Sequence, residues 1–349
     1  MINKTPLMVA EISANHGNQI EIVKKSIQKA KEIGCDAVKI QTYTPDTITL
    51  DCDNEYFQID TGTIWDGTTL HKLYQEAYLP WEWHPELFDY ARNIGIILFS
   101  TPFDFTAVDL LEECGNPIYK IASFEITDVP LIKYAASKGK PMVISTGIGT
   151  EEEIREAVEA CRVVGNEDIC LLKCTSQYPA RIEDANLATM VDMKERFGTK
   201  VGLSDHTMGD SVALAAAALG AELIEKHFIL DRSIGGPDSS FSMTPLEFEE
   251  MVHHVREVSA SVGTVDYSLD EKKKGSRKYA RSLFVVKDVR KGEPVTADNV
   301  RSIRPSDGMQ PKYYEDVLGC VFSQNVKRGT PFRKNFIVNV NREEKLDVY

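Results

Sequence analysis

Short apolar segments recur along most of the chain, and a longer amphipathic segment follows nearly every one of them. The short segments are continuously apolar and rich in β-branched residues, which is the pattern of parallel strands covered on both faces. Amphipathic stretches such as 21–33, 85–94 and 151–164 are predicted helices. The eight predicted strands are 7–12, 37–41, 96–100, 118–121, 142–145, 169–174, 201–204 and 223–227.

This alternation predicts an α/β fold, a (β/α)8 TIM barrel over residues 1–265. A doubly wound open sheet is the alternative, but no Gly-x-Gly-x-x-Gly follows the first strand, which weakens a dinucleotide-binding interpretation. Residues 266–280 are strongly charged and read as a linker. Residues 281–349 then form a small β-rich domain with predicted strands at 282–287 and 321–326.

One connection inside the predicted barrel is unusually long. It runs from Gln41 to Pro85 and holds all three tryptophans, Trp65, Trp81 and Trp83. Excursions of this length are usually functional, often as a lid or a pocket wall. A locally packed aromatic plug is the alternative.

Composition narrows the class of partner. The net charge of −13 argues against a nucleic-acid-binding surface. The sequence contains no run of about eighteen apolar residues, so we expect no membrane span. The N-terminus lacks the pattern of a secretory signal. Seven scattered cysteines without a Cys-x-x-Cys pair fit reduced thiols. We therefore expect a cytoplasmic protein that acts on small molecules.

Two histidines are the clearest candidate metal ligands. The strand near 201–203, the helix 210–219 and the strand 221–228 form one strand–helix–strand unit, whose two strands are parallel. His206 and His227 lie near the carboxyl ends of these strands, so both reach the same face of the sheet. Neutral imidazole is the commonest protein ligand for a divalent transition metal. The alternative is two unrelated histidines packed near loop ends.

Polar residues gather at the other predicted strand ends, where the active sites of such barrels lie. Lys39, Lys120 and Lys226 would repel one another there unless an opposite charge compensates them. Each lysine alone could instead bury its stem and keep its head in water. Together they predict a substrate that carries phosphate or carboxylate beside the metal. The remaining strand-end residues are Glu11, Gln41, Ser100, Thr101, Ser123, Ser145, Thr146, Lys173, Thr175, Ser176 and Ser204.

Ordered motifs over nearly the whole chain resemble the sialic acid synthase family. The tail, with Ile303-Arg304-Pro305, resembles the antifreeze-like (SAF, β-clip) domain at the C-terminus of that family. The matching strings lie at 10–16, 39–41, 100–102, 120–123, 145–147, 174–179, 204–207, 225–228 and 236–238.

Three further strings look most like the pseudaminic acid branch of that family. They are Ile64-Trp65-Asp66-Gly67, the segment 81–84 and the segment 238–242. Ser176 stands where N-acetylneuraminate synthases commonly carry asparagine, which also favours this branch and leaves one phosphoenolpyruvate contact open. Synthases of N-acetylneuraminate or legionaminate, with the same chemistry, are the alternative. A non-catalytic sugar-binding barrel is a distant one.

The resemblance implies condensation of phosphoenolpyruvate with an amino sugar, 2,4-diacetamido-2,4,6-trideoxy-L-altrose (6-deoxy-AltdiNAc), and water to give pseudaminic acid and phosphate. It implies that Glu11 and Asp238 handle protons, although Glu11 could merely pair with a neighbouring lysine. It also implies a divalent metal on His206 and His227, foremost Mn²⁺ with Mg²⁺ or Co²⁺ as alternatives, and a domain-swapped homodimer. The implied sugar contacts are Tyr178, Asp238 and Arg304. The implied phosphoenolpyruvate contacts are Lys39, Gln41, Thr101, Lys120, Ser123, Ser145, Ser176 and Ser204.

Overall fold

The computed structural model describes residues 5–60, 62 and 65–338. The chain divides into two compact units, Met1–Thr264 and Val265–Tyr349. The division falls close to residue 265, where the sequence predicted the end of the barrel. Ile64, part of a family string, and residues 339–349 of the predicted small domain lie outside the described residues.

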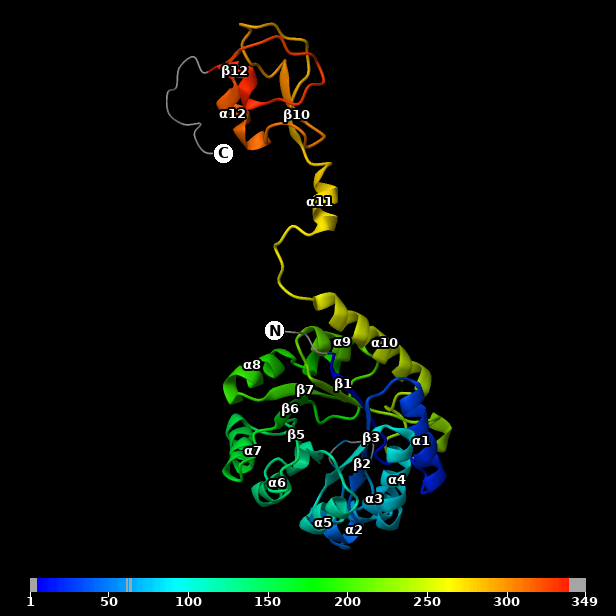
Figure 1. Cartoon of the computed structure of the whole chain (residues 1–349). Coiled ribbons are helices and arrows are strands. Elements are labelled where there is room, and N and C mark those ends of the chain that lie inside the picture. The colour runs from blue at the N-terminus through cyan, green and yellow to red at the C-terminus, as the bar shows by residue number, and fades with distance from the viewer. Residues whose placement is uncertain (1–4, 61, 63–64, 339–349) are drawn as a thin grey trace. The chain divides into compact units, whose positions relative to one another are not determined.

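The first unit is built around a closed barrel of eight parallel strands in chain order (Figure 1). Closure is made by β1 and β8, where Glu11 pairs in register with His227. This confirms the predicted barrel and rules out the open sheet. The strands are β1 (Leu7–Glu11), β2 (Ala37–Thr42), β3 (Ile97–Pro102), β4 (Tyr119–Ile121), β5 (Met142–Ser145), β6 (Ile169–Cys174), β7 (Lys200–Asp205) and β8 (Leu223–His227).

Helices surround the strands, and α7 shows why they form where they do. Thr150 and Glu153 make a reciprocal capping box at its start, which satisfies backbone donors that the helix leaves unpaired. Apolar side chains recur at helical spacing on its buried face. The helices are α1 (Ile20–Glu32), α4 (His84–Ile94), α5 (Phe105–Glu113), α6 (Val129–Ala136), α7 (Glu151–Val163), α8 (Ala188–Phe197), α9 (Ser211–Ala218) and α10 (Pro245–Val262).

Side chains along each strand alternate between the barrel interior and the layer of helices. On β8, Leu223 belongs to the small apolar cluster that fills the barrel, whereas Ile224 belongs to the larger core shared with the helices. Gly202 on β7 faces the interior, where an added Cβ would lie 2.3 Å from the carbonyl oxygen of Leu223. This position therefore has no room for a side chain. The same alternation decides which polar residues point into the site.

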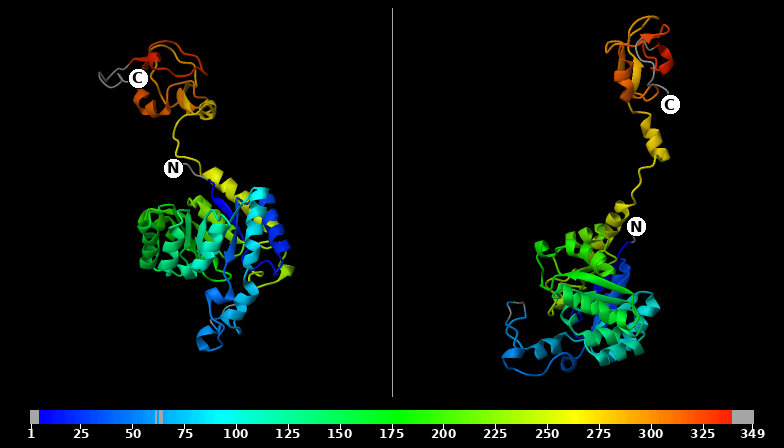
Figure 2. Two further views of the ribbon diagram at one scale, coloured as in Figure 1. Left: turned by 60° about the horizontal axis from the view of Figure 1, so that its bottom comes forward. Right: turned by 90° about the vertical axis from the view of Figure 1, so that its left-hand side faces the viewer.

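The long connection between β2 and α4 stands out from the body of the barrel in two views (Figure 2). It contains short helices, which were not predicted from the sequence. Tyr43 and Tyr74 meet edge to face across it, with ring centroids 5.5 Å apart. Its elements are α2 (Pro45–Ile48), η1 (Glu55–Phe57), α3 (Leu70–Ala77) and η2 (Trp81–Trp83).

The second unit has a small core of its own, which includes Leu283, Val300, Phe322 and Phe332. Up to residue 338, its strands form two antiparallel pairs, β9 with β10 and β11 with β12. The predicted strands at 282–287 and 321–326 are shorter in the structure, and the predicted linker contains helix α11. The elements are α11 (Glu271–Arg277), β9 (Ser282–Val285), β10 (Val300–Ile303), η6 (Pro311–Tyr313), α12 (Tyr314–Val317), β11 (Val321–Phe322), η7 (Lys334–Phe336) and β12 (Ile337–Val338).

Among the described residues, every helix is too short or too polar to cross a membrane.

Candidate active site

Four charged side chains meet inside the barrel at the carboxyl ends of its strands. Lys39 on β2 forms an ion pair with Glu11 on β1 and lies 3.5 Å from Glu225 Oε1 on β8. Lys120 Nζ on β4 lies 3.3 Å from the same Glu225 oxygen. All four side chains are buried. Two lysines and two carboxylates therefore form one compact charge cluster, which we call the lysine–glutamate cluster.

The sequence analysis assigned no role to Glu225, yet this residue organises the cluster. Converging lysines were predicted to need a bound anion, but Glu225 and Glu11 already offset their charge. Burial alone would raise the pKa of Glu225, but Lys120 and Lys39 outweigh it and lower that pKa. Burial raises the pKa of Glu11 to about 7, although Lys39 opposes the shift. Glu11 can therefore exchange a proton near neutral pH.

Lys226 does not join the cluster, so the expectation that it helps to hold the anion is wrong. It lies between Glu225 and His227 on β8, and alternation turns it toward the opposite face of the strand. Its Nζ lies 2.7 Å from Asp205 Oδ2 and also donates to the carbonyl oxygen of Thr207. The charge of Lys226 is therefore neutralised on the helix side of the barrel wall and does not face the barrel interior.

Two predicted hydroxyls attach to the lysine–glutamate cluster. Lys39 Nζ donates to Thr101 Oγ1 at 3.3 Å. Ser204 Oγ donates to Glu225 Oε1 at 3.2 Å. Gln41, the register partner of Thr101 on the next strand, is half-buried. The cluster therefore has neutral donors beside its charges.

Three more predicted serines surround a bare stretch of backbone after β5. The N–H of Gly147 donates to Ser123 Oγ at 3.1 Å. An added Cβ on Gly147 would lie 2.2 Å from Ser176 Oγ and 2.8 Å from Ser123 Oγ, so any other residue here would push both hydroxyls aside. Ser145 Oγ is buried without a hydrogen-bond partner among the described residues. Hydroxyls and a backbone N–H in such a cradle suit an anionic group.

The two predicted metal ligands lie side by side. The ring centroids of His206 and His227 are 5.3 Å apart. His206 Nδ1 donates to the carbonyl oxygen of Thr175 at 2.9 Å, which leaves Nε2 as the ring nitrogen that a ligand can use once the ring is neutral. Burial would lower the pKa of His206, but the neighbouring Cys174 outweighs it and raises that pKa. Burial, with the charge of His206 adding to it, holds the pKa of His227 well below its usual range. His227 Nδ1 has no hydrogen-bond partner within the described part of the chain.

These residues fit a divalent transition metal by donor type, because neutral imidazole is its commonest protein ligand. Burial already favours the neutral ring of His227, whereas His206 would give up its proton to the medium when a metal binds. Across residues 5–60, 62 and 65–338, no three side chains of His, Cys, Asp or Glu converge as a metal-binding group. The two histidines would therefore leave several coordination positions to water and substrate, as catalytic sites do.

Asp238 and the long connection form the wall beside the histidines. Asp238 Oδ2 accepts the N–H of Ala14 at 3.4 Å and lies 3.8 Å from His227 Nδ1. Burial raises the pKa of Asp238. Trp65 Nε1 donates to the carbonyl oxygen of Pro237 at 3.1 Å.

An aromatic surface continues this wall. The ring of Tyr178 lies 4.3 Å from His206, 5.3 Å from Trp65 and 5.4 Å from Phe241, measured between centroids. Tyr178 and Asp238, predicted to contact the sugar, therefore lie next to the predicted metal ligands. Arg304 belongs to the other unit, where it follows β10 and is exposed.

Sequence reasoning missed two further ionisable groups near the site. Cys174 Sγ lies 3.9 Å from His206 Nδ1, and although burial raises the pKa of this thiol, His206 brings it down to about 7. Burial raises the pKa of Glu125 to about 7, although the charge of Lys120 opposes this. Glu125 could have been noticed because it lies two residues after the predicted site residue Ser123. Cys174 could have been noticed because it ends β6, where its side chain points into the barrel.

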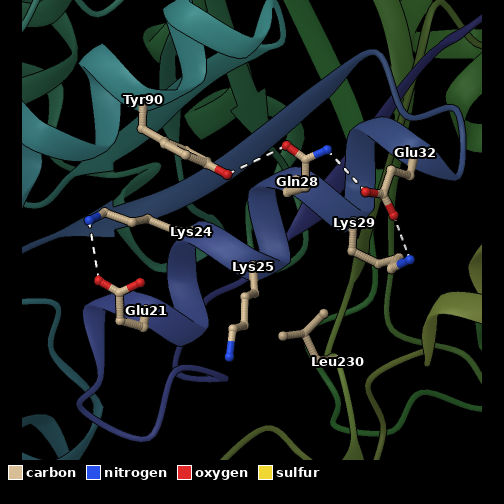
Figure 3. A pocket seen from close by; sticks show the side chains of 8 residues that line it. All are labelled: Glu21, Lys24, Lys25, Gln28, Lys29, Glu32, Tyr90 and Leu230. Atoms are coloured by element: carbon tan, nitrogen blue, oxygen red, sulfur yellow. Dashed lines mark hydrogen bonds and ion pairs between the residues drawn. The ribbon is translucent and has the colours of Figure 1, made fainter.

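A depression of about 420 Å³ lies outside the barrel along α1 (Figure 3). Most of its charged side chains are paired with one another, for example Lys29 with Glu32 and Lys24 with Glu21. Tyr90 donates to Gln28 at 3.4 Å across it. Because most of its charges are paired and none of its lysines is buried, this depression lacks the desolvated charges of the barrel site.

Two family models match the chain: the NeuB family over residues 26–267 and the SAF domain over residues 280–338. A pseudaminic acid synthase of Helicobacter pylori is 47% identical over 327 residues, which are 93% of this chain and 96% of that protein. An N,N'-diacetyllegionaminic acid synthase of Campylobacter jejuni is 36% identical over 95% of this chain and 100% of its own length.

A solved structure of similar fold is the N-acetylneuraminic acid synthetase of Leptospira borgpetersenii. It is 28% identical, with a TM-score of 0.70 over 78% of this chain and 90% of that one. The barrel carries charged residues and histidines at its strand ends, as the matched family models and the similar proteins lead one to expect for a synthase. The chain therefore belongs to the NeuB family of sialic acid synthase-like enzymes, with a C-terminal SAF domain.

Proposed function

We propose that this enzyme is a pseudaminic acid synthase, which condenses phosphoenolpyruvate with 6-deoxy-AltdiNAc and water to give pseudaminic acid and phosphate. The observation that carries the proposal is the gap in identity between 47% to a pseudaminic acid synthase and 36% to a legionaminic acid synthase, each over nearly the whole chain. A cytoplasmic location is part of the proposal, because scattered cysteines suit a reducing compartment.

The lysine–glutamate cluster is the proposed binding site of phosphoenolpyruvate. With Glu11 protonated, Lys39 and Lys120 carry two positive charges against the single negative charge of Glu225. That net charge attracts an anion, and the raised pKa of Glu11 makes its protonation accessible near pH 7. The hydroxyls, including that of Ser145, whose Oγ has no hydrogen-bond partner among the described residues, would orient the phosphate and carboxylate. The assigned contacts are Lys39, Gln41, Thr101, Lys120, Ser123, Ser145, Ser176 and Ser204.

His206 and His227 are the proposed ligands of a divalent metal, Mn²⁺ first and Mg²⁺ or Co²⁺ as alternatives. A bound metal supplies Lewis acidity to the aldehyde oxygen of the open-chain sugar. The fit rests on the adjacent rings of His206 and His227, on the Thr175 contact that occupies Nδ1 of His206 and leaves Nε2 for the metal, and on the neutral, buried ring of His227.

In the proposed reaction, carbon 3 of phosphoenolpyruvate forms a bond to the aldehyde carbon of the sugar, the aldehyde oxygen takes up a proton to become a hydroxyl, and carbon 2 acquires cationic character. Water adds to carbon 2 and loses a proton. The bond between carbon 2 and the bridging oxygen then breaks, so that phosphate leaves with that oxygen, and loss of the second water proton gives the keto group. Glu11 and Asp238 are the proposed donors and acceptors of protons, because burial raises the pKa of both carboxyl groups. Glu11 belongs to the lysine–glutamate cluster, and Asp238 lies beside His227. The ion pair of Glu11 with Lys39 is compatible with this role, since the pKa of Glu11 remains near 7.

The sugar is assigned to Tyr178, Asp238 and Arg304. Arg304 would enter from the SAF domain, and in a domain-swapped homodimer it would serve the active site of the other subunit. The planar guanidinium suits recognition of the acyl group on the sugar.

The test is phosphate release from phosphoenolpyruvate and Mn²⁺ with three sugars in turn: 6-deoxy-AltdiNAc, N-acetylmannosamine and the diacetamido mannose analogue. We expect release with 6-deoxy-AltdiNAc and a nine-carbon keto acid by mass spectrometry. Release with only one of the other sugars would move the enzyme to the sister branch. No release with any sugar would refute the synthase assignment.

A further inference from the structure

A buried ion pair lies directly behind the two histidines. Asp205 and Lys226 are register partners on β7 and β8, and each immediately precedes one histidine in the chain. Lys226 Nζ lies 2.7 Å from Asp205 Oδ2, and both residues are only 2% exposed. Because neighbours on a strand face opposite sides, the pair faces the helices while His206 and His227 face the barrel interior.

Further hydrogen bonds lock this pair in place. Asp205 Oδ1 accepts the N–H of Thr207 at 2.9 Å and its hydroxyl at 2.7 Å. Lys226 also donates to the carbonyl oxygen of Thr207. Ala180 donates its N–H to the carbonyl oxygen of His206 at 2.9 Å, which ties the same segment to the loop after β6. Both carboxylate oxygens and the ammonium are thus engaged across the ends of two strands.

We propose that the Asp205–Lys226 ion pair fixes the separation of His206 and His227. Asp205 and Lys226 are then positioning residues for the site of the divalent cation. The inference rests on the metal site of the proposed function. It explains why charge is buried here at all, since an apolar pair of similar volume often stabilises a protein equally well or better. An ion pair with directional hydrogen bonds holds two strand ends in one arrangement. Apolar contacts are not directional, so they restrict the arrangement less.

The test is the affinity of the purified full-length protein for Mn²⁺, measured from the electron paramagnetic resonance signal of free Mn²⁺ and by calorimetry. We expect Lys226→Met to raise the Kd for Mn²⁺ by about 10- to 100-fold, the range found when residues that orient metal ligands are replaced. Turnover should return largely to normal at saturating Mn²⁺, because the variant keeps both histidines.

The sign of this change separates positioning from simple electrostatics. Lys226 is a positive charge that contributes to lowering the pKa of His227, so its removal by Coulomb effects alone would tighten the binding of a cation. A lower Kd in Lys226→Met would therefore overturn the proposal, and so would an unchanged one.

Two controls deal with unfolding. The double variant Asp205→Asn/Lys226→Met leaves no unpaired buried charge and is expected to fold better than Lys226→Met while keeping the weakened affinity. Recovery of wild-type affinity in the double variant would overturn the proposal. Val255→Ala, in the buried face of α10, removes core contacts away from the site and should lower Tm without changing the Kd.

The outcome is distinguishable from failure of the proposed function. If the unaltered protein binds no Mn²⁺, there is no metal site to position and the inference is refuted. The identity of the synthase product is a separate measurement that does not depend on Asp205 or Lys226.

Discussion

Replacing Glu11 by glutamine tests how burial and charge compete inside the site. The pKa of Glu11 rises from 4.5 to about 7, and each pKa unit corresponds to about 1.4 kcal/mol. Ionised Glu11 therefore costs the folded state roughly 3 kcal/mol above pH 7. For a raised pKa, the stabilising contribution is complete below pH 4.5 and is lost as the pH rises through about 7. Glutamine mimics the neutral acid, so Glu11→Gln should abolish this loss.

We expect Glu11→Gln to exceed the unaltered enzyme in free energy of unfolding by up to about 3 kcal/mol at pH 8, and to match it near pH 4.5. Lys39 keeps Glu225 at 3.5 Å in the variant, so its charge is not left alone. Activity should fall by about 10²- to 10⁴-fold, the usual contribution of a general acid or base. The Kd for Mn²⁺ should be unchanged, because neither histidine is altered.

Urea unfolding at pH 4.5 and pH 8, with kcat and the Kd for Mn²⁺ measured on the same samples, checks these expectations. Glu225→Gln is the matched control, because the pKa of Glu225 is lowered and its ionised form is the stabilising one. That variant should lose stability at pH 8. If Glu11→Gln also lost stability at pH 8, pairing with Lys39 would outweigh burial. Near-normal kcat in Glu11→Gln would remove Glu11 from the chemistry.

Three further changes test other parts of the account. His206→Ala should abolish Mn²⁺ binding in calorimetry while leaving Tm within a few degrees, and retained affinity would remove it from the ligand set. Gly202→Ala should destabilise the barrel by on the order of 3 kcal/mol in urea unfolding, because its Cβ would meet the Leu223 carbonyl oxygen at 2.3 Å, and an unchanged midpoint would refute this packing. Arg304→Ala should raise the KM for the sugar by roughly tenfold or more while the KM for phosphoenolpyruvate stays the same; a normal sugar KM would exclude Arg304 from the site.

Much of the barrel could be predicted because buried parallel strands leave continuous apolar runs. The strands predicted at 142–145, 169–174 and 223–227 coincide with β5, β6 and β8. Prediction was less accurate where polar residues end a strand. β7 begins at Lys200 and ends at Asp205, because backbone hydrogen bonds to its neighbours set its length rather than hydropathy.

The charged linker shows a different limit. Helix α11 forms there without a buried face, supported by the Asp270 cap on the Lys273 N–H and by the ion pair of Lys274 with Glu271. A search for apolar periodicity does not detect a helix that is held by its caps and surface charges.

Within the site, the sequence located the strand ends but not the pairing of their charges. Counting residues along β8 shows that Glu225 and His227 share one face, so Lys226 could have been excluded from the sequence alone. The contact between Lys120 and Glu225 could not have been predicted, because it joins residues 105 positions apart. Such long-range pairs depend on how the barrel closes.

The most direct test of the central claim uses phosphoenolpyruvate labelled with ¹⁸O in the bond between carbon 2 and the phosphate. The enzyme is incubated with Mn²⁺, this labelled substrate and 6-deoxy-AltdiNAc, and both products are weighed by mass spectrometry. We expect pseudaminic acid whose new keto oxygen comes from water, together with phosphate that carries the label. Unlabelled phosphate, or phosphate formed without the nine-carbon acid, would contradict this expectation.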